Sequence, residues 1–172
     1  MYSIITQVIG IVAAVIAGLS YQAKTPKGIA MVQCVSGTLF AANFFMLGAF
    51  TGAAMNVIGL GRNLFYCFGK KEVVAKTATP IIVSSVFVIA GALSWNGWFS
   101  ILPIIGMVVS SFTYWLENAR VARLMCLITS IAWIIYNIKS FSIGGIATEV
   151  FALFSIFTAI IRYDVITKGV EK

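Results

Sequence analysis

The residue best able to do chemistry is Glu149, one of five acidic residues in a chain of 172. It lies in the apolar stretch FSIGGIATEVFALFSIFTAI (141–160). If segment 143–163 is a membrane-spanning helix, the carboxyl group lies on the order of 10 Å below the membrane surface, at about 1.5 Å per residue. Acidic groups at such depth usually face a cavity or a partner. Glu149 could therefore exchange protons or coordinate a cation or a substrate amine, and a structural salt bridge is the alternative.

Further candidates are polar or aromatic residues of other apolar segments. Amides can hydrogen-bond a solute, and aromatic rings offer flat apolar walls for a ring-like ligand. Arg62 is expected to snorkel toward the membrane surface, with pairing to Glu149 or binding of an anionic ligand as alternatives. Trp133 could instead be a packing residue, and Tyr136 an interfacial anchor. The candidate substrate-binding residues are Asn56, Glu149, Trp133, Phe40, Asn43, Tyr136, Asn137 and Arg62.

The composition is that of an integral membrane protein. The chain is 60% hydrophobic and 10% charged, with a mean hydropathy of +1.01, whereas soluble domains are about 45–50% apolar and about 25% charged. The net charge of +7 is carried by basic residues between apolar segments, which favours membrane lipid over nucleic acid as the partner. The chain has no histidine, and its three cysteines lie in or beside apolar segments. No metal site or cofactor is therefore expected.

Seven segments are long and apolar enough to be spans: 3–22, 28–46, 50–68, 78–95, 98–116, 121–138 and 143–163. Seven spans put eleven basic residues on one side and Lys139 on the other. The eleven are Lys24, Lys27, Arg62, Lys70, Lys71, Lys76, Arg120, Arg123, Arg162, Lys168 and Lys172. By the positive-inside rule, this pattern predicts a multi-pass protein of the bacterial inner membrane with its N-terminus outside and its C-terminus in the cytoplasm.

The first and last three segments are predicted to be structural repeats, with seven helices without internal symmetry as the alternative. A shift of 93 residues aligns loop charges, loop lengths and intramembrane polar positions, and it places Asn56 on Glu149, Asn43 on Tyr136 and Phe40 on Trp133. Two parallel three-helix units need an odd helix between them. The predicted fold is therefore all-α, with one bundle at 1–70, a linker helix at 71–97 and a second bundle at 98–172. In this 3+1+3 plan Asn56 and Glu149 face each other across the central axis.

The stretch FMLGAFTGAAMNVIGLGRNLFYCFGK (45–70), preceded by GTLFAANF (37–44), resembles the YgjV-type bacterial inner membrane proteins. That family is grouped with the SWEET, SemiSWEET and PnuC-like transporters. The resemblance implies two triple-helix bundles joined by a linker helix, and a substrate held by an asparagine pair with nearby aromatic residues. Asn56 and Trp133 fit that pattern. Glu149 stands where the second asparagine is expected, which disfavours a neutral sugar and favours a cationic solute or proton coupling.

The sequence therefore favours a small-solute transporter that works by alternating access. The alternative is a non-transporting accessory or assembly protein that binds a partner helix. An enzyme is not expected, because no carboxylate pair, Ser–His or Cys–His constellation accompanies Glu149. Since one chain contains both halves, either a monomer or a homodimer would suffice. A central cavity lined by Asn56, Glu149 and Trp133 would favour transport, whereas a filled centre and a lipid-facing polar stripe would favour the partner-binding alternative.

Overall fold

The structure, a computed structural model, describes residues 3–20, 26–113, 115–116 and 118–166, and within these residues every regular element is helical. Each of the seven predicted segments coincides with one long helix. A short helix, α4, lies in the stretch predicted to be a loop. The elements are α1 (Ile4–Ser20), α2 (Pro26–Met46), α3 (Phe50–Phe68), α4 (Lys71–Val74), α5 (Ala78–Leu93), a 3₁₀ turn (Trp98–Ser100), α6 (Ile101–Thr113), α7 (Ala119–Ser140), α8 (Ile143–Ala159) and a π-helical turn (Ile160–Ile166).

Polar side chains fix the starts of the two most C-terminal helices. The Asn118 side chain accepts hydrogen bonds from the first turn of α7, and the Ser142 hydroxyl accepts one from Gly145 N–H of α8 at 3.3 Å. Both satisfy N–H groups that have no partner within the helix. Between the two helices, Phe141 adopts a left-handed backbone conformation with φ of 55° and ends α7. The α7–α8 turn is therefore tight, and it starts α8 at the end of the bundle where α7 finishes.

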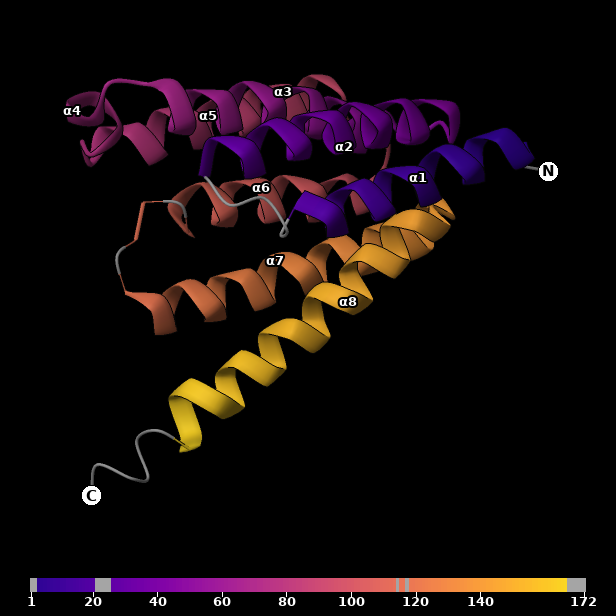
Figure 1. Cartoon of the computed structure of the whole chain (residues 1–172). Coiled ribbons are helices and arrows are strands. Elements are labelled where there is room, and N and C mark those ends of the chain that lie inside the picture. The colour runs from indigo at the N-terminus through magenta and orange to yellow at the C-terminus, as the bar shows by residue number, and fades with distance from the viewer. Residues whose placement is uncertain (1–2, 21–25, 114, 117, 167–172) are drawn as a thin grey trace.

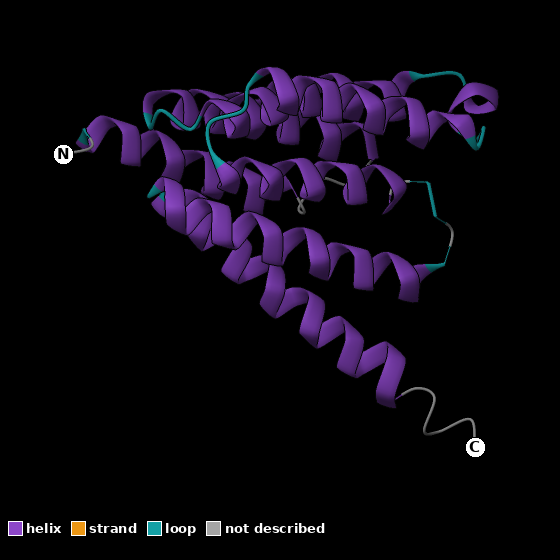
Figure 2. Ribbon diagram, turned by 180° about the vertical axis from the view of Figure 1, so that it is seen from behind, coloured by secondary structure: helices purple, strands orange, loops and turns teal. Residues whose placement is uncertain are grey.

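The long helices pack side by side in one bundle (Figures 1 and 2), in which we refer to α1–α3 as the first triple and to α6–α8 as the second triple. In the first triple, α1–α3, helix α2 packs between α1 and α3; in the second triple, α6–α8, helix α7 packs between α6 and α8. Two seams join the triples, because α1 packs against α8 and α3 packs against α6. Helix α5 lies on one flank only, against α6 and α3.

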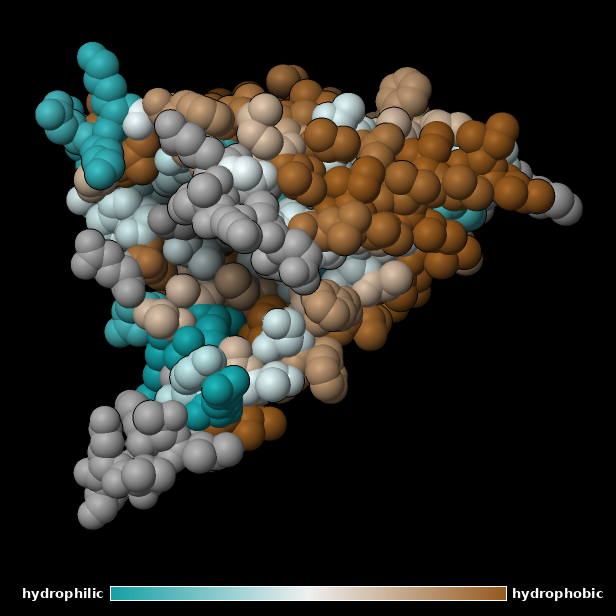
Figure 3. All heavy atoms as spheres, in the orientation of Figure 1, coloured by the Kyte–Doolittle hydropathy of each residue, from teal (hydrophilic) through white to brown (hydrophobic). Residues whose placement is uncertain are grey.

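The face of the bundle in Figure 3 carries a broad apolar area on the side toward the N-terminus. Ile4, Leu93 and Trp98 are more than four-fifths exposed. By length and composition, two helices of the described chain are able to cross a membrane, Ala119–Ser140 and Ile143–Tyr163. Four apolar helices are shorter: Ile4–Ser20, Met31–Met46, Ala78–Leu93 and Trp98–Thr113. A contiguous apolar surface of this extent is suited to lipid rather than water.

Most of the basic side chains that the structure describes gather at one end of the bundle. Lys70, Lys71 and Lys76 surround α4 and are exposed, at the end where α7 begins (Figure 1). Lys139 lies near the other end of α7, by the α7–α8 turn. Lys24, Lys168, Lys172 and the side chain of Lys27 lie outside the described residues.

Candidate functional site

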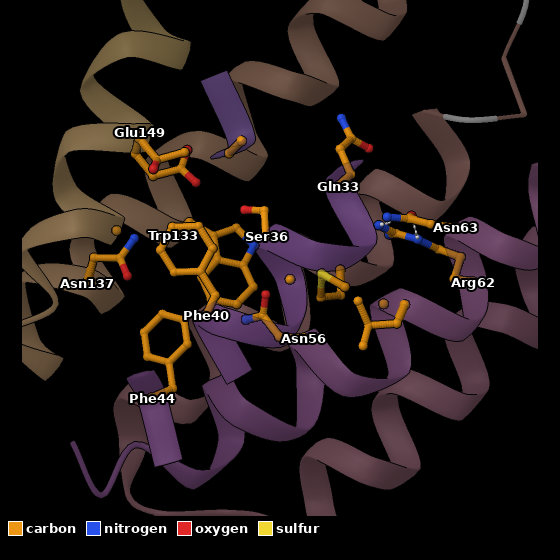
Figure 4. A pocket seen from close by; sticks show the side chains of 17 residues that line it. Gln33, Ser36, Phe40, Phe44, Asn56, Arg62, Asn63, Trp133, Asn137 and Glu149 are labelled. Atoms are coloured by element: carbon orange, nitrogen blue, oxygen red, sulfur yellow. Dashed lines mark hydrogen bonds between the residues drawn. The ribbon is translucent and has the colours of Figure 1, made fainter. Parts of the chain in front are cut away.

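A cavity of about 230 Å³ lies between the two triples. Its walls come from α1, α2 and α3 on one side and from α6, α7 and α8 on the other, and α5 contributes nothing to the wall that the structure describes. Glu149 and Asn137 lie at one end, and Arg62 and Asn63 lie at the other (Figure 4). The cavity is large enough for several water molecules or for a small organic solute.

Glu149 is a half-buried wall residue in the second turn of α8. The side chain of Ser130 on α7 is its neutral polar neighbour. Within the part of the chain that the structure describes, no basic side chain pairs with it. The alternative of a structural salt bridge is therefore not formed by the described residues. An acidic group with a neutral hydroxyl as its polar neighbour retains acceptor capacity for a ligand.

Asn56 and Asn137 bring two amides to the same cavity. The Asn56 side chain donates to the Gly52 carbonyl of its own helix at 2.9 Å, which leaves its oxygen as an acceptor. Asn137 is 2% exposed, and its Oδ1 has no hydrogen-bond partner among the described residues. Its amide nitrogen points toward Trp133 and Glu149 (Figure 4). A buried amide oxygen without a hydrogen-bond donor costs free energy until a water or a ligand provides one.

Aromatic rings form the wall beside these polar groups. Trp133, Phe40 and Phe44 line the cavity, and the Phe44 ring centroid lies 5.8 Å from that of Trp133 and 6.3 Å from that of Phe40. Trp133 is at once a packed residue and a wall residue, with 9% of its surface exposed. An aromatic face beside a carboxyl group is an arrangement that suits an organic cation.

Two of the predicted binding residues instead join helices at the end of the bundle where α8 begins. Asn43 is fully buried; its amide donates to the Thr6 carbonyl of α1 at 2.6 Å and accepts from the Ser142 hydroxyl at 2.7 Å. The Tyr136 hydroxyl accepts the Gly52 N–H of α3 at 2.9 Å. Neither residue lines the cavity. Both interactions cross between helices, so they close this end of the bundle.

The expectation that Arg62 snorkels to the membrane surface is wrong. Arg62 is buried, with 9% of its surface exposed. Its guanidinium donates to the Ser110 hydroxyl of α6 and to the Asn63 side chain, and it lies 5.4 Å from the centroid of the Phe87 ring of α5. These interactions connect α3 to α5 and α6 at one end of the cavity. The polar partners compensate for the burial of the charged side chain.

Other wall residues were not singled out from the sequence as binding residues. Asn63 and Thr148 are polar neighbours of Arg62 and Glu149 in the chain, and both line the cavity. In the sequence, both could have been found by their position next to a candidate residue. Met107 and Ala17 also line the cavity, but nothing in their residue types distinguishes them from ordinary packing residues.

Helices with an apolar outer surface around a polar internal cavity define the class of the protein as an all-helical integral membrane protein. The particular family follows from comparison with family models, in which the Imp-YgjV model, described as a bacterial inner membrane protein, matches residues 4–166. The chain belongs to this family and is a multi-pass protein of the bacterial inner membrane. Comparisons with curated proteins and with solved structures gave no match.

Proposed function

We propose that the protein is a small-solute transporter that works by alternating access, with the solute bound between the two triples. The observation that carries this proposal is the central cavity, because Asn56, Glu149 and Trp133 all line it. A cavity between two repeated helix bundles is where many transporters bind their substrates. In this proposal the N-terminus is outside and the basic end around α4 is cytoplasmic.

Equivalent interactions in the two triples support a 3+1+3 repeat. The Ser36 hydroxyl donates to the Ala13 carbonyl at 2.8 Å and thereby links α2 to α1. The Thr129 hydroxyl donates to the Gly106 carbonyl at 3.4 Å and links α7 to α6 in the same way. Donor and acceptor are both displaced by 93 residues, the shift derived from the sequence. The two seams follow the same rule, because α3 against α6 corresponds to α8 against α1.

The glycines of the third helix in each triple are also equivalent. A Cβ at Gly52 of α3 would lie 3.1 Å from the Phe44 ring of α2. A Cβ at Gly145 of α8 would overlap the Asn137 amide of α7. Both pairs are again related by 93 residues, so the close helix contact is repeated. Asn137 stands in the second triple at the position that Phe44 has in the first. The second contact is therefore polar, and it places a hydrogen-bonding group in the cavity.

The chemistry of the cavity favours a small cationic solute, with proton linkage through Glu149. Glu149 can accept from an ammonium group, the unpartnered Oδ1 of Asn137 can accept a hydrogen bond, and Trp133 provides an aromatic face for a positive charge. In this reading the protein is not an enzyme and carries no cofactor. The cavity surrounds the solute rather than presenting a reactive group to it.

The alternative of an accessory protein that binds a partner helix has less support. That function would need a polar stripe on the lipid-facing surface, and the described polar residues Asn56, Asn137 and Glu149 line the cavity instead. A filled centre would also be expected, whereas the centre holds about 230 Å³ of space. We therefore base the proposed function on transport alone.

A thermal-unfolding screen of the purified protein against small organic cations tests the proposal. At least one solute should raise the Tm of the wild type and have no effect on Glu149→Gln, because the variant keeps the size of the side chain and removes its charge. Glu72→Gln is the matched control, since Glu72 is exposed on α4 and the same change there should leave the response intact. A higher Tm of Glu149→Gln, with no solute that shifts either protein, would overturn the transport proposal.

A further inference from the structure

A second hollow lies between α1 and α8. It is an apolar groove of about 320 Å³ whose described walls come from these two helices alone. The helices touch backbone to backbone at one end of the groove, because a Cβ at Gly144 would overlap the Gly10 carbonyl. From this contact α8 diverges toward the C-terminal end of the chain (Figure 1). The walls beyond the contact are mainly small or apolar side chains, among them Ala14, Ala147 and Phe151.

The equivalent seam on the other flank is filled. There, α3 packs against α6, and α5 packs on both helices. A Cβ at Gly59 of α3 would lie 2.8 Å from the terminal carbon of Met107 of α6, so the methionine reaches across that seam. The positions displaced by 93 residues are Ala152 and Ala14, and both line the groove. Within the described residues, the α1–α8 seam therefore has alanine at the position equivalent to Met107, and no helix packs on it as α5 packs on α3 and α6.

The groove lies next to the central cavity. Ala17 of α1 and Thr148 of α8 line both spaces. Thr148 precedes Glu149 in the chain, so the side chain that separates groove and cavity stands next to the carboxyl group. A molecule whose polar head lies at Glu149 would reach the groove with its tail by passing between Ala17 and Thr148.

We propose that the solute enters the cavity sideways from the lipid through the α1–α8 groove, and that it is an amphipathic amine with one alkyl chain. Its ammonium head lies at Glu149 and its tail lies between α1 and α8. This inference rests on the proposed function, and it adds the class of substrate and the route of access. Charge complementarity selects the head group, and the small side chains of the groove leave room for a single chain.

The groove selects the alkyl tail by the space that it offers, and not by a gain in hydrophobic free energy. An alkyl chain in a membrane is already in apolar surroundings, so it gains little by moving from lipid into an apolar groove. Affinity that merely rises with chain length would therefore report partition into the bilayer. A side chain that fills the groove, in contrast, excludes a ligand with a tail and leaves a short amine unaffected. The experiment is designed around this steric difference.

The test compares octylammonium with ethylammonium in lipid nanodiscs. Binding is followed by the fluorescence of Trp133, with Trp95, Trp98 and Trp115 replaced by phenylalanine. Ala14→Met introduces the residue found at the equivalent position 107. It should weaken octylammonium binding about tenfold and change ethylammonium binding less than about twofold, because the longer side chain occupies the space that the tail needs and ethylammonium has no tail there. Ala147→Phe, which fills the groove from α8, should act in the same direction.

The matched control is Ala42→Met, because Ala42 is exposed on α2 and lies outside the groove. It should bind both amines as the wild type does. If ethylammonium binds the wild type but not Glu149→Gln, while Ala14→Met and Ala147→Phe leave octylammonium binding intact, the lateral route is overturned and the proposed function stands. Equal weakening of both amines by Ala14→Met also overturns the lateral route. Failure of both amines to bind the wild type overturns the cation site and the lateral route together.

Discussion

The phenolic oxygen of Tyr136 on α7 accepts the backbone N–H of Gly52 on α3 at 2.9 Å. Gly52 lies in the first turn of α3, where backbone N–H groups have no partner within the helix. The first residue before α3, Ala49, provides no side-chain cap. Tyr136, a residue of the second triple, therefore caps the N-terminus of α3 in the first triple.

Tyr136→Phe should destabilise the protein by about 1–3 kcal/mol, because it leaves the buried Gly52 N–H without an acceptor and changes the ring packing little. Chemical unfolding in detergent, followed by the loss of tertiary signal, measures the difference. Tyr163→Phe is the control, since Tyr163 is 52% exposed, and it should change stability by less than about 0.5 kcal/mol. Equal stability of the two variants would contradict the capping role of Tyr136.

Gly145→Ala should destabilise the bundle and impair solute binding, because the added methyl group overlaps the Asn137 amide. Overpacking of this kind costs about 1–3 kcal/mol. Gly61→Ala is the matched control on α3, where no atom lies within 4 Å of an added Cβ. That change should stabilise the protein by up to about 1 kcal/mol, because alanine is the better helix former. A Tm of Gly145→Ala at or above that of Gly61→Ala would contradict the observed Asn137–Gly145 contact.

A hydrophobic carbodiimide should modify Glu149 from within the membrane, and a solute that occupies the cavity should slow the reaction. The physical reason is access, because a bound solute covers the carboxyl group. Mass spectrometry of peptides that contain Glu149 or Glu72 measures both rates in one sample. Modification of Glu72, which is exposed on α4, should not respond to the solute. An equal effect on both residues would indicate a change of reagent activity rather than occupation of the cavity.

The orientation of the chain can be tested with single cysteines in a variant that lacks Cys34, Cys67 and Cys126. Phe141→Cys, in the exposed α7–α8 turn, should react with a membrane-impermeant maleimide added to intact spheroplasts. Lys71→Cys, at the basic end, should react only after permeabilisation, because positive loops stay in the cytoplasm. The reverse pattern would place the N-terminus inside and contradict the proposed topology.

The positions of the helices and several wall residues could be predicted from the sequence. The membrane spans follow from runs of apolar residues. The depth of a residue in the membrane follows from its position along its helix. Asn56, Glu149, Phe40 and Trp133 were expected at a shared site, and all four line the cavity. Asn137 was also expected there, although its unpartnered oxygen could not be predicted without the helix that covers it.

Depth alone does not determine the direction of a side chain around its helix. Asn43 and Tyr136 were expected to bind solute, but they face neighbouring helices and are occupied by Thr6, Ser142 and Gly52. Arg62 was expected to reach the surface because a long basic side chain usually can. The hydroxyl of Ser110, a residue of a helix distant in sequence, provides a buried partner instead.

The one-sided position of α5 has a mechanical consequence. Helix α5 packs against α3 and α6 on one flank. On the opposite flank, a groove lies between α1 and α8, which touch at the Gly10–Gly144 contact. A helix bundle that is held together on one flank and open on the other rotates about the flank that is held together. In the proposed alternating-access mechanism, relative rotation of the triples would therefore be smallest beside Arg62 and largest where α1 and α8 diverge.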